Sequence, residues 1–110
     1  MKILILLTTL ALVSTNAWGD YSVKGEGNYS CPEYVSAKRS NTAKLYSSIT
    51  WVQGFITGVN HQRAQATDTD SFIAQDIPAA SIARWLENYC QEHPADDVAD
   101  AAEVFITENE

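Results

Sequence analysis

Few residues of this chain have the type and spacing that catalysis requires. The two histidines, His61 and His93, fall in different predicted helices, and neither belongs to a known catalytic motif. Serine, histidine and aspartate occur without a Gly-x-Ser-x-Gly elbow or a spacing that supports a catalytic triad. The adjacent carboxylates Asp96 and Asp97 point apart on a helix, which suits capping better than acid–base catalysis. The sequence therefore predicts a protein that is not an enzyme and that needs no cofactor.

The two cysteines, Cys31 and Cys90, are the remaining candidates for covalent or metal chemistry. They form no Cys-x-x-Cys motif for thiol exchange and no cluster with histidine at zinc spacing. Asp68 and Asp70 are spaced as in a calcium loop, but the glycine and the final glutamate of the EF-hand pattern are missing. We therefore expect no metal site. We expect a disulfide between Cys31 and Cys90, which is the default for an even cysteine count in an oxidising compartment.

The first 19 residues have the features of a secretory signal peptide. Lys2 precedes the apolar run ILILLTTLALV, which is too short to span a bilayer. Small residues at Ala17 and Gly19 predict cleavage before Asp20, with cleavage after Ala17 as the alternative. The sequence thus predicts a periplasmic or secreted protein that has no membrane segment after cleavage.

Charge is distributed unevenly along the predicted mature chain. Removal of Lys2 with the signal changes the net charge from −7 to −8, because 14 acidic residues remain. Residues 20–67 carry 5 basic and 3 acidic side chains, whereas residues 68–110 carry Arg84 and 11 acids. The acidic half would repel the phosphates of nucleic acid and anionic lipid. We expect a protein partner, which can be basic, unless the carboxylates only keep a small domain soluble.

One long helix must position the rest of the chain. Residues 41–60, NTAKLYSSITWVQGFITGVN, contain no charged side chain after Lys44. Gly54 and Gly58 lie on a face of small residues, where another backbone can approach closely. We therefore expect both faces of this helix to be covered, with Gly54 and Gly58 at a helix crossing. The opposite, apolar stripe consists of Leu45, Ile49, Val52, Ile56 and Val59, widened by Trp51 and Phe55.

Shorter helices flank the long one. Residues 20–30, DYSVKGEGNYS, have no helical pattern and are expected to be a flexible lead-in. Residues 31–38 predict a first helix with Pro32 in its first turn. Asp76 is expected to cap a third helix, which ends at Glu92 because Pro94 disfavours helical geometry in the residue before it, and His93 caps that end.

The carboxyl-terminal part predicts one more helix. Asp96 and Asp97 suit a helix N-terminus, and Val98, Ala101, Ala102 and Phe105 give it an apolar face. No strand-like alternation or repeat occurs. Residues 31–110 are therefore expected to form one all-α domain of about four helices with one disulfide.

A polar loop is the candidate surface for the partner. Residues 66–75 lose the apolar periodicity, and loops on a rigid scaffold usually carry recognition. We expect Asp68, Asp70 and Asp76 to contact the partner protein. The sequence is also compatible with a homodimer.

Four aromatic residues are the candidate core. Trp51, Phe55, Trp85 and Tyr89 recur at helical spacing, which is more typical of a core than of a ligand pocket. We expect them to pack between helices.

The chain resembles the Rap/Tai family of exported immunity proteins. The resemblance covers about residues 31–106, and its motifs are GFITGV at residues 54–59, Ile77-Pro78, WLENYC at residues 85–90 and His93-Pro94, before a helix that ends Val104-Phe105. It implies a helical periplasmic protein that binds and blocks a peptidoglycan-cleaving amidase toxin delivered by type VI secretion. The chain departs from the family pattern at Trp51 and Asp76, near which the family has further cysteines.

A weaker resemblance is to the HdeA/HdeB acid-stress chaperones. They too are exported helical proteins of similar mature length with one long-range disulfide. The resemblance implies that acid exposes apolar surface, which then holds unfolded clients. An acidic chain supplies the physical basis, because its carboxylates titrate as the pH falls. An uncharacterised structural role in the envelope is the third alternative.

Overall fold

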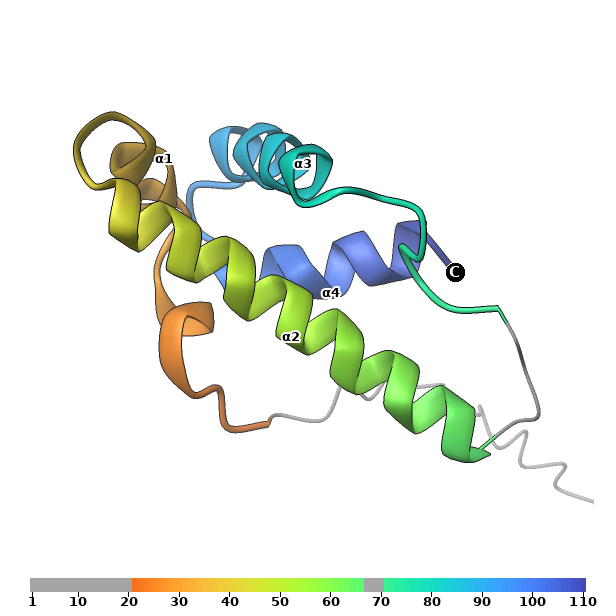
Figure 1. Ribbon diagram of the computed structural model, residues 1–110. Coiled ribbons are helices and arrows are strands. Elements are labelled where there is room, and N and C mark those ends of the chain that lie inside the picture. The colour runs from red at the N-terminus through yellow and green to blue at the C-terminus, as the bar shows by residue number, and fades with distance from the viewer. Residues whose placement is uncertain (1–20, 67–70) are drawn as a thin grey trace, which may run out of the picture.

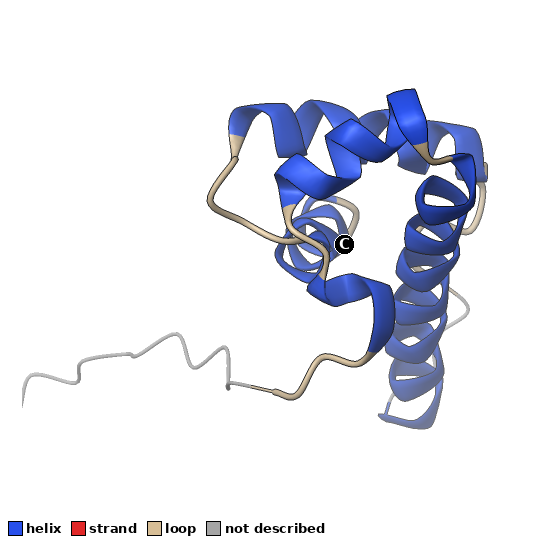
Figure 2. Ribbon diagram, turned by 90° about the vertical axis from the view of Figure 1, so that its left-hand side faces the viewer, coloured by secondary structure: helices blue, strands red, loops and turns tan. Residues whose placement is uncertain are grey.

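Four α-helices and one short 3-10 helix make up the part of the chain that the structure describes (Figure 1). The computed structural model describes residues 21–66 and 71–110. The predicted signal, Asp20, Asp68 and Asp70 lie outside these residues. Figure 2 shows helices and loops over the described residues, without a strand. The elements are η1 (Gly25–Asn28), α1 (Cys31–Ser40), α2 (Thr42–Ala66), α3 (Ala79–Glu92) and α4 (Val98–Glu108). The all-α prediction is confirmed.

Helix α1 begins at a complete capping box. The Ser30 hydroxyl accepts a hydrogen bond from the Glu33 backbone N–H at 3.1 Å, and the Glu33 carboxylate accepts one from the Ser30 N–H. Both bonds satisfy N–H groups that a helix end otherwise leaves without partners. Pro32 fits the first turn, as predicted.

Helix α2 is longer than predicted, since it ends at Ala66 instead of Asn60. The residues after the apolar stripe are mainly Gln, Arg and Ala, which favour helix and extend it. Asn41 caps the start, because its Oδ1 accepts a hydrogen bond from the Lys44 N–H at 3.0 Å. Near the end, the Asn60 amide bonds to both backbone groups of Ile73 and holds the returning chain against the helix.

The predicted crossing at Gly54 and Gly58 is wrong for the described residues. Both glycines are exposed, and a Cβ built on either one meets no described atom within 4 Å. The buried residues of α2 are Ser48, Ile49, Val52 and Ile56, all away from the two glycines. Apolar burial explains the difference, because covering the aliphatic stripe removes more apolar area from water than covering glycines.

Helices α3 and α4 pack against each other, and a short turn connects the end of α3 to the start of α4. Pro78, and not Asp76 as predicted, is the N-cap of α3, while exposed Asp76 lies in the turn before it. His93 caps the end of α3, as predicted. Asp97 caps α4 in a second capping box, in which its Oδ1 accepts a hydrogen bond from the Asp100 N–H at 2.8 Å.

The core lies between the stripe of α2 and the facing sides of the other helices. The Cys31–Cys90 disulfide is buried in it, with Cα atoms 4.7 Å apart, and joins the start of α1 to the end of α3. The predicted pairing is confirmed. The aromatic residues Trp51, Phe55, Trp85 and Tyr89 are half-buried and pack against the buried cluster. The largest fully buried side chains are Tyr34, Leu86, Val52 and Val98.

The segment expected to be a flexible lead-in is structured over residues 21–30. Its 3-10 helix η1 packs against α2 and α4. The Trp51 indole Nε1 donates a hydrogen bond to the Lys24 carbonyl at 2.6 Å, and its ring covers Gly27. The glycines that predicted flexibility instead make room for the indole ring. The prediction of a segment without regular structure is therefore corrected.

The environment of Tyr34 predicts a loss of stability in alkali. Its hydroxyl donates a hydrogen bond to the Ala83 carbonyl at 3.1 Å, and burial, with a contribution from Glu87, raises its pKa to about 12. A raised pKa stabilises the fold below the unfolded value of about 10, and this contribution is lost as the pH rises through about 12. The pKa values of Tyr21 and Tyr89 are also raised, mainly by burial.

We therefore expect the free energy of unfolding to fall between pH 10 and about 12, and to fall less in Tyr34→Phe. Near pH 7 the variant should lose about 1 kcal/mol with its hydrogen bond. Urea denaturation of both proteins across this pH range measures the effect. An equally steep loss in both proteins would contradict the role of Tyr34.

Candidate functional site

A cleft opens between α1, α2 and α3, with a volume of about 400 Å³. Its apolar lining comes mainly from α2 and α3, where small alanines leave the space unfilled. These residues are Tyr34, Leu45, Ile49, Ala79, Ala80 and Ala83. This volume lies within the usual range for binding pockets, which are mostly apolar with a few placed polar groups.

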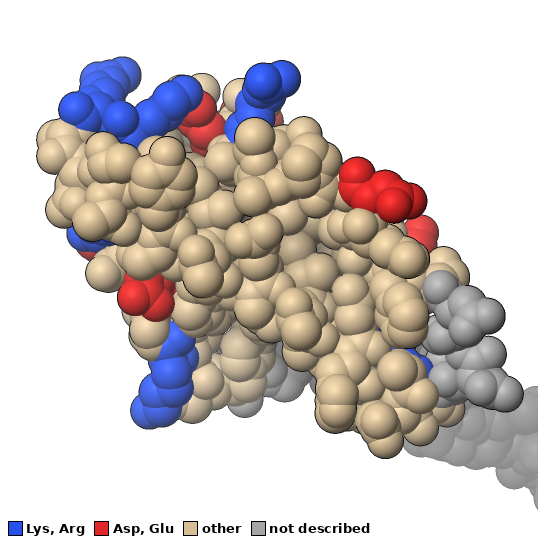
Figure 3. Space-filling view, viewed as in Figure 1, with Lys and Arg blue, Asp and Glu red and all other residues tan. Residues whose placement is uncertain are grey.

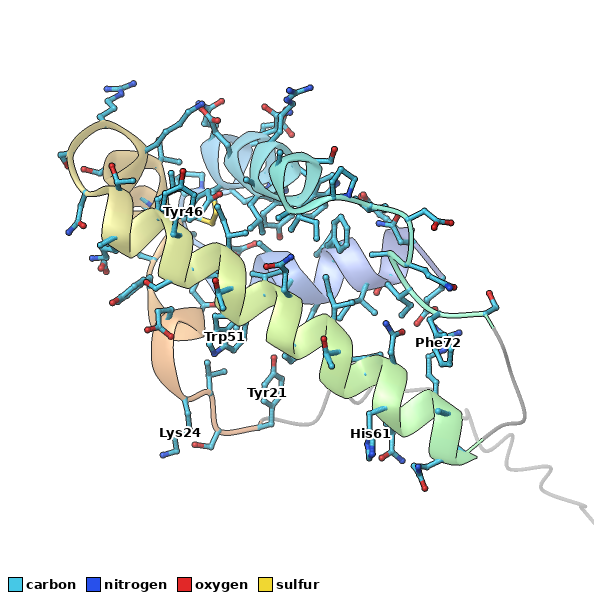
Figure 4. The ribbon with its side chains drawn as sticks, viewed as in Figure 1. Tyr21, Lys24, Tyr46, Trp51, His61 and Phe72 are labelled. Carbon is cyan, nitrogen blue, oxygen red and sulfur yellow. A yellow bond between two sulfur atoms is a disulfide. The ribbon has the colours of Figure 1, made fainter. Side chains whose placement is uncertain are left out.

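Tyr46 forms one wall of the cleft. It projects from the amino-terminal half of α2 (Figure 4), and 64% of its surface is exposed. The only other large hydrophobic residue that is exposed among the described residues is Tyr21, at 47%. Tyr21 stacks on Phe55, with ring centroids 6.2 Å apart, whereas no described ring stacks on Tyr46. Tyr46 is therefore the described aromatic side chain best placed to contact another molecule.

Charged groups line the rest of the cleft. Lys38 of α1 forms an ion pair with Glu87 of α3, which bridges the two helices. Arg84 of α3 makes no hydrogen bond or ion pair with a described residue. The lining therefore has two cations and one anion, although the whole chain has a net charge of −7. Figure 3 shows Lys and Arg side chains along the edge over α1 and α3, beside a broad uncharged face over α2.

Three links hold the walls of the cleft in place. The disulfide and the Lys38–Glu87 ion pair both join α1 to α3. The hydrogen bond from Tyr34 to Ala83 adds a third link between the same helices. A site on linked helices keeps its shape when a ligand enters, which lowers the entropic cost of binding.

Only one of the three acidic residues predicted to bind the partner can be located relative to this cleft. Asp68 and Asp70 lie outside the described residues, so only Asp76 can be placed. Asp76 is exposed in the turn before α3 and does not line the cleft. The surface around Asp76 and the cleft are therefore separate candidates.

The histidines occupy unrelated positions. His61 is exposed on α2. The His93 ring stacks on Tyr89 with centroids 4.0 Å apart, and its Nδ1 lies 2.9 Å from the Tyr89 carbonyl oxygen. These contacts suit the capping role predicted for His93.

Sequence reasoning missed the cleft residues, although two signals were present. Arg84 is the only lysine or arginine in residues 68–110, on a helix that begins with small residues. Tyr46 is a bulky side chain next to Ser47 and one turn before Thr50 on α2. An isolated base and an isolated aromatic side chain on exposed helix faces are both typical of binding surfaces.

Metal binding and membrane insertion find no support in the described residues. No group of three or more His, Cys, Asp or Glu side chains in them is arranged to hold a metal ion. Within the same residues, no helix combines the length and the hydropathy needed to cross a bilayer.

Comparison with known proteins gives no match. No protein-family model, curated protein or solved structure is significantly similar to this chain. Its function must therefore be inferred from its own residues and their geometry.

Proposed function

We propose that this chain is an exported, non-catalytic protein that binds another protein, and that it inhibits a peptidoglycan-cleaving amidase toxin. The observation that carries the proposal is the cleft, on whose walls Tyr46 and Arg84 stand without a partner among the described residues. Tyrosine and arginine are the residue types, with tryptophan, that dominate binding energy at protein interfaces. The resemblance to exported immunity proteins supplies the choice of an amidase.

The proposed inhibition is steric. The partner binds to a preformed surface of the helices, and the disulfide between α1 and α3 limits the motion of that surface. The inhibitor then blocks access to the active site of the enzyme without reacting itself. Export is part of the proposal and is supported by the disulfide, because such bonds persist mainly in oxidising compartments.

Two surfaces take part in the proposed complex. The cleft offers apolar contact around Tyr46, and the loop at residues 66–75, together with the adjoining Asp76, offers the carboxylates of Asp68, Asp70 and Asp76 to a basic region of the enzyme. Complementary charge raises the association rate and orients the partners, whereas buried anchors determine the lifetime of the complex.

The test is a titration with a peptidoglycan amidase encoded beside the gene for this chain. We expect the purified protein to inhibit the amidase, and Tyr46→Ala to weaken binding by about tenfold or more. Reversing the three loop aspartates to lysine should also weaken binding, mainly through a slower association rate. Glu92→Lys, an exposed charge reversal outside both surfaces, is the control. Absence of inhibition by the unmodified protein would reject the proposal.

The second candidate is an acid-stress chaperone, and the anchoring of α4 favours it. The Tyr89 hydroxyl donates to Asp96 Oδ2 at 2.5 Å, and the Trp85 Nε1 donates to Glu108 Oε2 at 3.0 Å. These charge-assisted bonds connect α3 to Asp96, which precedes the cap of α4, and to Glu108 at the end of α4. Loosening of α4 in acid would expose its large buried face while the disulfide keeps α1 attached to α3.

Two shifted carboxyl groups act in opposite directions as the pH falls. The hydrogen bond from Lys44 lowers the pKa of Glu33, so its stabilising effect is present above the unfolded pKa and is lost on acidification through the lowered value. Burial raises the pKa of Asp97, so its contribution is present in acid and is lost as the pH rises. Acid sensitivity would therefore depend on Glu33 and on the net positive charge that accumulates when the carboxylates are protonated.

The chaperone candidate predicts apolar dye binding and protection of an aggregating client at about pH 2 to 3, and neither at pH 7. A reporter client such as a thermally unfolded enzyme provides the assay. If the protein does not bind the dye in acid, the chaperone candidate is rejected.

A further inference from the structure

The cleft combines an apolar floor with one cation that lacks a partner. Lys38 is neutralised by Glu87, because the two side chains form an ion pair. Arg84 lines the same cleft and makes no ion pair or hydrogen bond with a described residue. The remaining charge of the lining is therefore the guanidinium of Arg84.

A guanidinium selects its partner by geometry as well as by charge. Its planar set of N–H donors matches the two oxygens of a carboxylate, and this charge-assisted pair is among the stronger hydrogen-bonded contacts in proteins. Next to it, Leu45 and Ile49 form an apolar floor, and Tyr46 offers an exposed ring. An occupant must therefore bring apolar bulk for the floor and negative charge for the rim.

We propose that the cleft receives a segment of the protein partner in which a bulky apolar side chain stands beside a carboxylate. This inference rests on the proposed function, because it assigns the chemistry of the partner at one of the two proposed surfaces. The segment that enters the cleft is thus acidic and apolar, and it differs from the basic region of the partner that is expected to contact the acidic loop. The partner therefore presents an acidic, apolar segment to the cleft and its basic surface to the loop.

Three blocked pentapeptides serve as probes of the cleft. Each has a central phenylalanine, which is flanked on both sides by glutamate, by glutamine or by lysine. We expect the glutamate peptide to bind about tenfold more tightly than the glutamine peptide, and the lysine peptide to bind most weakly. Titration followed by NMR chemical shifts gives the three dissociation constants and locates the contact at Tyr46.

Two variants and one control separate the contributions. Arg84→Gln should remove the preference for glutamate while leaving the fold intact, since Arg84 is exposed and makes no hydrogen bond or ion pair with a described residue. Tyr46→Ala should weaken binding of all three peptides by a similar factor, because it removes an uncharged side chain that contacts the phenylalanine common to all three. Arg39→Gln removes an exposed arginine of α1 outside the cleft and should change nothing.

Equal binding of the three peptides, or a glutamate preference that survives in Arg84→Gln, would overturn the inference. Self-association of the chain that disappears in Arg84→Gln would also overturn it, because the occupant would then be a second copy. The proposed function is tested separately: peptide selectivity without amidase inhibition refutes the function and keeps the cleft chemistry. Inhibition without peptide selectivity refutes the cleft chemistry alone.

Discussion

Reduction of the Cys31–Cys90 disulfide is expected to lower the free energy of unfolding by about 4 kcal/mol. The bond joins residues 59 apart in sequence, so its loss returns a large amount of chain entropy to the unfolded state. Small domains have a net stability of about 5 to 15 kcal/mol, so this loss would remove a large share of the stability of the folded protein. Chemical denaturation of the oxidised and reduced forms measures the difference.

A double variant distinguishes the effect of losing the disulfide from other effects of the reductant. Cys31→Ala with Cys90→Ala removes both sulfurs from buried positions, and a reductant should then have no further effect on stability. Since the bond also links two walls of the cleft, reduction should weaken peptide binding before the protein unfolds globally. A loss below about 1 kcal/mol would show that the unfolded chain gains little freedom on reduction.

The elements of the fold are largely predictable from local patterns. Ile49, Val52 and Ile56 fall on one apolar stripe, and the same stripe is buried in the structure. Asp97 stands before an apolar run at the position where a helix needs an acceptor, and it caps α4. The disulfide is equally predictable from the sequence, because two cysteines allow only one pairing.

The relations between elements are less predictable. The small face around Gly54 and Gly58 predicts close approach, but a single segment cannot show whether another helix is available to cover it. Here the other described helices lie elsewhere and leave both glycines exposed. The same limit applies to Gly27, since its need for a small side chain comes from Trp51, a residue distant in sequence.

The cleft illustrates this limit most clearly. Its charged and aromatic walls come from three helices, through Lys38, Tyr46 and Arg84. These side chains come together only because of the way α1 and α3 pack against α2. The sequence of a single helix does not show this packing. The alanines of α3 are visible in the sequence, but only the packing decides whether they make a tight crossing or a hollow.

Gly27→Ala is expected to lower the free energy of unfolding by about 1 to 3 kcal/mol. An added Cβ would lie 2.3 Å from the Trp51 ring, well inside van der Waals contact. The ring cannot easily move away, because its Nε1 bonds to the Lys24 carbonyl at 2.6 Å and its face stacks on Phe55 at 5.4 Å. Docking of η1 against α2 must therefore loosen.

Gly54→Ala provides a matched control with the opposite expected sign. Gly54 lies inside α2, where an added Cβ meets no described atom within 4 Å, so alanine should stabilise the helix by about 1 kcal/mol. Urea denaturation compares the two variants, and tryptophan fluorescence reports whether Trp51 becomes more exposed in Gly27→Ala. A neutral effect of Gly27→Ala with unchanged fluorescence would show that residues 21–30 are not docked in solution, because only a docked segment forces the added methyl group against the indole.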